Sequence, residues 1–184
     1  MADPHDLLVV SIPGLAGWML QAHAPVLLGF AERARRASLV VPAGCQPAQL
    51  EAALETGMFP PHTGLPFWEL AGRVAGAGSC RLHRLGHLAQ ADHAALADAI
   101  ARADAEFASI EATHRDDFAL VVVSAWARTP AGLPATQDAP PDERPVLLSR
   151  NLEQPKTCMG LLEVAGLLRR ALTGQRVQDA CPTP

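Results

Sequence analysis

One cysteine lies where a side chain could act as a nucleophile. Cys45 follows the apolar run ASLVV (37–41), which predicts a strand, and precedes a segment with helical spacing. A thiol becomes a useful nucleophile when a helix N-terminus or a nearby histidine lowers its pKa. His62, His83 or His87 could act as that histidine if the loops converge. The alternative is that Cys45 is a small apolar residue in a tight strand-to-helix turn, and we favour this packing role.

Two histidines suggest a metal site. His83 and His87 are four residues apart, which would place them on one face of a helix, although Gly86 between them argues against a helix there. Imidazole and carboxylate groups are ordinary ligands of zinc and manganese. One interpretation is therefore a single zinc or manganese ion held by both histidines with Asp138 or Asp142. The other is that the histidines bond to backbone carbonyl groups in a loop.

The composition excludes several classes of protein. The 184 residues are 49% hydrophobic and 18% charged, which excludes a disordered chain. No apolar run reaches the roughly 18–20 residues that span a bilayer. The N-terminus lacks the positive region of a secretory signal, and four cysteines without a CxxC pair are typical of free thiols in a reducing compartment. We therefore expect a cytoplasmic protein without membrane contact.

The charge pattern argues against a nucleic-acid-binding protein. The formal net charge is −4, and Lys156 is the only lysine. Arginines gather at Arg33, Arg35 and Arg36, close to the predicted end of a helix, where cations complement the helix dipole. We interpret this cluster as a solvated helix end, with an anion site as the alternative.

Runs that are apolar throughout alternate with helical segments along the chain. The predicted strands cover residues 6–12, 37–41, 80–85, 118–126 and 145–149, and the predicted helices cover 17–36 with a break at Pro25, 47–56, 67–77, 93–112 with Asp92 as N-cap, and 157–173. This alternation predicts an α/β fold: a single three-layer α/β/α domain over residues 1–175 with a mostly parallel central sheet, followed by a flexible tail at 176–184. Ligands of such sheets bind beyond the carboxyl ends of the strands, so the loops at 11–17, 42–47, 83–90 and 124–144 are the candidate site.

Four motifs follow one another in a characteristic order: VVSIPGL (9–15), PAGCQPAQ (42–49), HRLGH (83–87) and VVVSAWA (121–127). Their order resembles the alkaline phosphatase superfamily, in particular its type I phosphodiesterase/nucleotide pyrophosphatase branch. In that branch the first, third and fourth motifs contain Asp-Gly-Leu, Asp-x-x-Gly-His and Ser-Asp-His-Gly. The second is the nucleophile turn, with threonine where this chain has Cys45. The correspondence runs over about residues 6–172 and implies an alkaline phosphatase-like fold.

The resemblance also implies that the family's metal chemistry is dismantled. Members of the family hold two divalent ions, which need about three protein ligands each. Here Pro13 and His83 stand where the family has aspartate, and Ala125 and Trp126 replace its Asp-His pair. His87 is the ligand that remains in its expected place. A lone imidazole holds too few donor atoms for two ions.

We therefore expect a non-catalytic, degenerate alkaline phosphatase-like protein without a cofactor. It would act as a binding or accessory subunit, paired with itself or with another protein, and His62 and Trp126 are its candidate substrate-binding residues. One alternative is a hydrolase or transferase of altered mechanism with Cys45 as nucleophile. The other is a remnant metal-dependent phosphoesterase or phosphodiesterase that holds a single zinc or manganese ion at His83 and His87.

Overall fold

The computed structural model describes residues 5–59, 62, 64–114, 117–153 and 156–174. In this part of the chain six strands form one sheet in the order β3-β1-β4-β5-β2-β6. The strands are β1 (Leu7–Ser11), β2 (Arg35–Val40), β3 (Cys80–Arg84), β4 (Ala119–Val123), β5 (Val146–Arg150) and β6 (Cys158–Gly160). β5 runs antiparallel to both of its neighbours, and the other pairings are parallel. The prediction of a mostly parallel sheet is confirmed.

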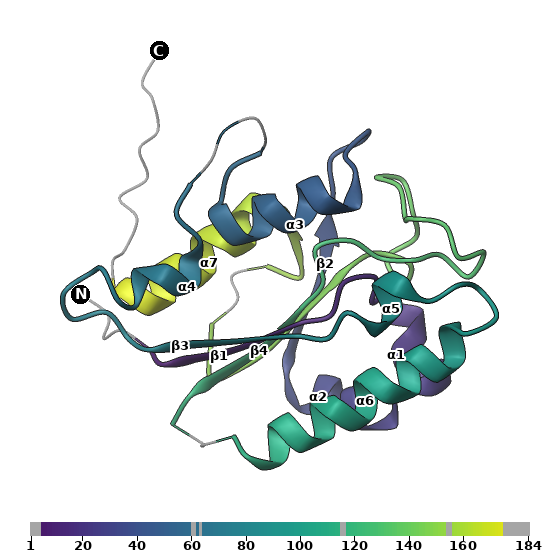
Figure 1. Cartoon of the computed structure of the whole chain (residues 1–184), viewed down its shortest axis with the longest axis horizontal. Helices are drawn as coiled ribbons and strands as arrows, with labels where there is room; N and C mark the ends of the chain where they lie inside the picture. Colours follow the sequence, from purple (N-terminus) through teal and green to yellow (C-terminus); the bar gives the residue numbers. More distant parts are fainter. Residues whose placement is uncertain (1–4, 60–61, 63, 115–116, 154–155, 175–184) are drawn as a thin grey trace.

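Helices cover the sheet on both faces (Figure 1). They are α1 (Gly17–His23), α2 (Pro25–Arg33), α3 (Pro47–Thr56), α4 (Phe67–Leu70), α5 (His87–Gln90), α6 (Leu96–Ala112) and α7 (Leu161–Thr173). The side chains of α3, α4 and α7 pack with Leu7 and Val9 of β1, and those of α1, α2, α5 and α6 pack with Leu8 and Val10. Alternate residues of one strand thus enter different cores, which explains why the central strands β1 and β4 are apolar along nearly their whole length rather than alternating.

Local interactions explain where several of the helices begin or end in the structure. The predicted break at Pro25 is confirmed, because α1 ends at His23 and Pro25 opens α2, where its missing N–H costs nothing. The helix predicted over 67–77 ends at Leu70, since the segment after it is rich in glycine and Gly76 has a φ of +77°. Asp92 accepts a hydrogen bond from the Ala95 N–H at 2.8 Å, but α6 begins only at Leu96, so Asp92 is not its N-cap.

Two short elements were not predicted. Residues Cys158–Gly160, assigned to the last helix from the sequence, form strand β6 instead, because the backbone there pairs with β2. Helix α5 begins at His87, where Gly86 argued for a loop, while His83 lies in β3. The two histidines therefore do not share a helical face. The predicted tail at 176–184 lies outside the described residues.

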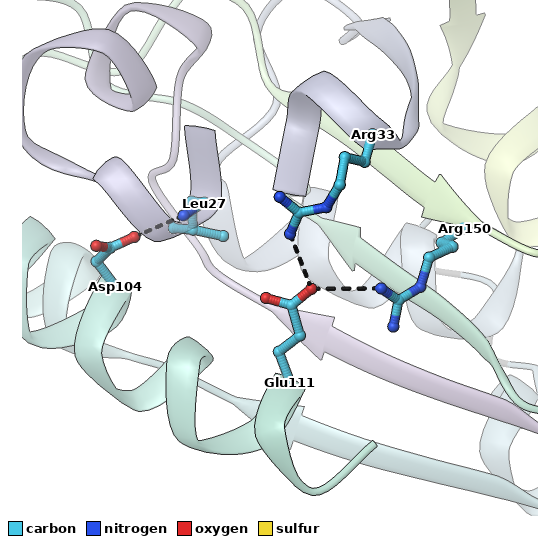
Figure 2. A network of polar contacts seen from close by, with 5 residues as sticks. All are labelled: Leu27, Arg33, Asp104, Glu111 and Arg150. Carbon is cyan, nitrogen blue, oxygen red and sulfur yellow. Dashed lines mark hydrogen bonds and ion pairs between the residues drawn. The ribbon is translucent and has the colours of Figure 1, made fainter. Parts of the chain in front are cut away.

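A carboxylate from α6 holds the start of α2 (Figure 2). Ala24, the N-cap residue of α2, provides no side-chain acceptor. Asp104 instead accepts hydrogen bonds from the Val26 N–H at 3.1 Å and the Leu27 N–H at 2.8 Å, and it is only 5% exposed. Asp104 therefore satisfies two of the backbone donors that every helix leaves unpaired at its N-terminus, and it does so from another element.

Replacing Asp104 should destabilise the fold. Asp104→Ala leaves one buried and one partly buried N–H group without an acceptor, so the free energy of unfolding should fall by about 2 kcal/mol. Urea denaturation followed by circular dichroism measures this loss. Asp98→Ala, an exposed position on the same helix, should cost less than about 1 kcal/mol. Equal losses in the two variants would contradict the capping role.

Candidate functional site

The loops that follow β1 and β4 continue to pair beyond the ends of the strands. The Gly14 N–H donates to the Trp126 carbonyl oxygen at 3.1 Å, and the Arg128 N–H donates to the Gly14 carbonyl oxygen at 3.0 Å. Gly14 has a φ of +93°, which a side chain would oppose. Backbone hydrogen bonds thus join two of the four candidate loops, those after β1 and β4, and they place Gly14 directly beside Trp126.

The indole of Trp126 packs against these paired loops. A Cβ added at Gly14 would lie 3.4 Å from the indole Cη2 and 3.3 Å from the Leu88 Cβ, so the ring, the glycine and Leu88 are in close contact. The indole Nε1 donates a hydrogen bond to Oε1 of Glu51 in α3 at 2.8 Å. Trp126 is only 6% exposed. It is therefore both a core residue and a link between the end of β4 and α3.

Beside the indole lies a cavity of about 250 Å³ at the carboxyl ends of β2 and β4. Cys45 and Trp126 both line it, so the structure brings these two predicted site residues together. The rest of the lining comes from two loops and from the first turns of α3: Val41, Pro42, Ala43, Gly44, Pro47, Leu50 and residues 134–138. The cavity lies at the edge of the sheet where α/β proteins bind ligands.

Cys45 occupies the predicted strand-to-helix turn. Gly44 before it has a φ of +75°, and Gln46 after it is the N-cap of α3. The Gln46 N–H donates to the Gln49 Oε1 at 2.8 Å, and Pro47 is the first helical residue. Cys45 is half-buried and packs against the core on the α3 side of the sheet. The position of Cys45 is consistent with both interpretations given above. Its thiol lies near the start of a helix, as a nucleophile would, and the residue is also a small one in a tight turn.

The three candidate histidines lie in different environments. His83 lines a separate pocket of about 90 Å³ between β3 and the end of α6. His87 faces α6, where its Nε2 lies 2.8 Å from the Glu106 Oε1. The exposed His62 makes a backbone hydrogen bond to Phe59 at 3.1 Å. None of the three lines the cavity beside Cys45 in the described part of the chain.

The donor groups at the sheet edge do not fit a pair of divalent ions. Pro13 and Ala125 have no side-chain donor atom, and the only polar atom of the Trp126 side chain is an N–H that already donates to Glu51. Among the described residues no three His, Cys, Asp or Glu side chains are grouped so that they could hold a metal ion. His87 and Asp138 line different cavities.

Sequence reasoning did not identify Glu51. Its carboxylate fixes the indole, and the two residues are 75 positions apart in the chain. Glu51 follows Leu50 in an ordinary amphipathic helix, so no local pattern marks it. Only the placement of α3 over the end of β4 gives it a role.

A second thiol provides a reference for the reactivity of Cys45. Cys80, at the start of the edge strand β3, packs against the core, and its burial raises the pKa of its thiol to about 12. The charged form is disfavoured because the surroundings cannot solvate it. Cys80 therefore stays protonated and unreactive at neutral pH, whereas Cys158 is exposed.

Comparisons with known proteins establish the fold. No protein-family model matches the chain, and no curated protein matches it either. The crystal structure of the lipoteichoic acid synthase LtaP from Listeria monocytogenes is similar, with a TM-score of 0.68 at 10% sequence identity. The match covers 97% of this chain and 74% of that chain. The expected three-layer, alkaline phosphatase-like α/β fold is thereby confirmed.

The helices give no sign of a membrane span. Within the described residues, none combines the length and the apolar character that crossing a bilayer requires.

The three described cysteines should react with iodoacetamide in a fixed order at pH 7.5. Cys158 should react first because it is exposed, Cys45 more slowly because it is half-buried, and Cys80 last because its thiol stays protonated. Peptide mapping by mass spectrometry gives the three rates in one sample. Labelling of Cys45 faster than of Cys158 would show an activated thiolate and would support the nucleophile hypothesis.

Proposed function

We propose that this protein is a non-catalytic member of the alkaline phosphatase-like fold that binds a small ligand in the cavity beside Cys45 and Trp126. In its broader form the proposal is a binding or accessory subunit that works with a second copy or with another protein, within the cytoplasm. Fold alone does not determine function, so the proposal depends on the residues at the sheet edge.

The observation that carries the proposal is the position of the Trp126 indole. Two-metal phosphoester hydrolysis needs open space and oxygen or imidazole donors around the reacting phosphoryl group. Here the indole packs against Gly14 and directs its single N–H to Glu51. At Pro13, Ala125 and Trp126, three of the positions where the resemblance implies metal ligands, no side chain therefore offers a donor atom to a metal ion. Binding remains the use that the cavity supports best.

The lining indicates what kind of ligand would fit. Most of the wall is apolar, including Val41, Leu50 and the face of Trp126, and Asp138 is the one carboxylate among the described residues that line it. A volume of about 250 Å³ lies below the roughly 300–1,000 Å³ of typical drug-sized pockets. The ligand we propose is therefore a small, mainly apolar molecule with at most one polar end.

The altered-mechanism hypothesis has one observation in its favour, which is that Cys45 lies just before the start of α3. A helix N-terminus stabilises a thiolate. Acyl or phosphoryl transfer by a thiol also needs a base within hydrogen-bonding reach, and the described cavity lining contains no histidine. We therefore keep this hydrolase or transferase second, and the remnant phosphodiesterase with one zinc or manganese ion third.

Catalysis can be tested directly. The purified chain should not hydrolyse bis-p-nitrophenyl phosphate or p-nitrophenyl phosphate, with or without added zinc or manganese. A Cys45→Ala variant should give the same background rate, because the thiol does no chemistry. Turnover that a chelator abolishes and added zinc restores would contradict the proposal, and turnover lost only in Cys45→Ala would establish the altered mechanism.

Binding can be tested with the fluorescent probe 8-anilinonaphthalene-1-sulfonate. The probe should bind saturably and brighten, because its rings leave water for the wall formed by Trp126. Thr136→Phe, which places a ring at an exposed position of the cavity lining, should weaken binding at least about tenfold, a loss of roughly 1.4 kcal/mol. Ala131→Phe is the matched control, because Ala131 is exposed in the same loop and does not line the cavity. Equal binding in both variants would exclude this cavity as the site.

A further inference from the structure

Three arginines converge on a cleft at the other end of the sheet. The cleft measures about 290 Å³ and is lined by Arg33 at the end of α2, Arg35 at the start of β2 and Arg150 at the end of β5. β2 runs from this cleft toward the cavity that follows its carboxyl end, so the strand separates the two sites. Two of the three arginines that the sequence groups together, Arg33 and Arg35, thus meet Arg150, which lies 115 or more residues further along the chain.

A nearly buried carboxylate holds two of the arginines (Figure 2). Oε1 of Glu111 in α6 lies 3.4 Å from a terminal nitrogen of Arg33 and 3.4 Å from one of Arg150, and its side chain is 17% exposed. These distances exceed the roughly 2.7–2.9 Å of strong charge-assisted hydrogen bonds. One oxygen therefore orients two guanidinium groups, each with five N–H donors, without saturating either of them.

Further contacts fix the walls of the cleft. The Arg150 guanidinium lies 5.8 Å from the centroid of the Phe30 ring, and its side chain is 28% exposed. Asn151 has a φ of +60° and donates from Nδ2 to the Phe118 carbonyl oxygen at 3.3 Å, which shapes the turn after β5. Arg150 is thus held in place before any ligand arrives, and preorganisation of this kind lowers the cost of binding.

We propose that this cleft binds a small anion with two oxyanion groups, such as two phosphates or two carboxylates. The planar guanidinium fork matches both groups in a bidentate manner. Among the described residues, the cleft is lined by three arginines and one carboxylate, Glu153, while Glu111 pairs with Arg33 and Arg150. These groups together carry a net positive charge in a chain whose net charge is −4. Glu111 is a positioning residue, and the arginines contact the ligand.

Isothermal titration with inorganic pyrophosphate and with citrate tests this site. The wild-type chain should bind at least one of them saturably, and the tighter of the two identifies phosphate or carboxylate as the preferred group. Arg33→Gln should weaken binding about tenfold, because one charge-assisted contact is lost. Arg33 is 61% exposed, so this variant should still fold, which circular dichroism checks.

Two further variants sharpen the test. Glu153→Gln should tighten binding severalfold, since it removes the negative charge at the rim. Arg73→Gln is the matched control, because Arg73 is equally exposed but pairs with Glu69 outside the cleft, and it should leave binding unchanged. No saturable binding of either anion up to about 10 mM would overturn the proposal, as would equal weakening by Arg33→Gln and Arg73→Gln.

Discussion

The contact between the Trp126 indole and Glu51 is the interaction on which the candidate site depends. It fixes the loop after β4 to α3 at a hydrogen-bond distance of 2.8 Å, and it sets the ring against Gly14. The loop after β1 is then held by backbone hydrogen bonds on either side of Gly14. A polar bond at one end of the indole and close packing at the other leave it a single orientation. That orientation forms one wall of the cavity beside Cys45.

The residues that build the fold differ from the residues that would build a metal centre. At 10% identity to the lipoteichoic acid synthase LtaP, the chain has a similar fold, built on its six-stranded sheet, with a TM-score of 0.68. Such a sheet needs only apolar strands and amphipathic helices, and many sequences meet that requirement. A metal centre needs particular donor atoms at particular positions, and we propose that Pro13, Ala125 and Trp126 occupy such positions in this chain. Architecture and chemistry therefore respond to different constraints within one chain.

Sequence patterns predicted the elements whose signal is local. All five residues of β4 are buried, and their apolar, β-branched character predicts this directly. Pro25 marked the boundary between two helices for an equally local reason. Strand β6 was missed because three residues show no period, and its partner β2 lies far away in the chain.

The candidate site was harder to predict, because Asp104 and Glu51 act on groups more than seventy positions away and no pattern marks such pairs. His83 and His87 are close in sequence but separate for a related reason, since His83 lies in strand β3 and His87 opens helix α5.

Strand β5 also determines when the chain can complete its fold. The group β3-β1-β4 and the pair β2-β6 meet only through β5 within the described sheet. β2 is synthesised early, yet both of its neighbours come from residues 146–160. A nascent chain on the ribosome therefore carries β2 with two open edges until residues 146–160 emerge. During that interval β2 is open to chaperones and to mispairing, although in the finished sheet it lies between two neighbouring strands.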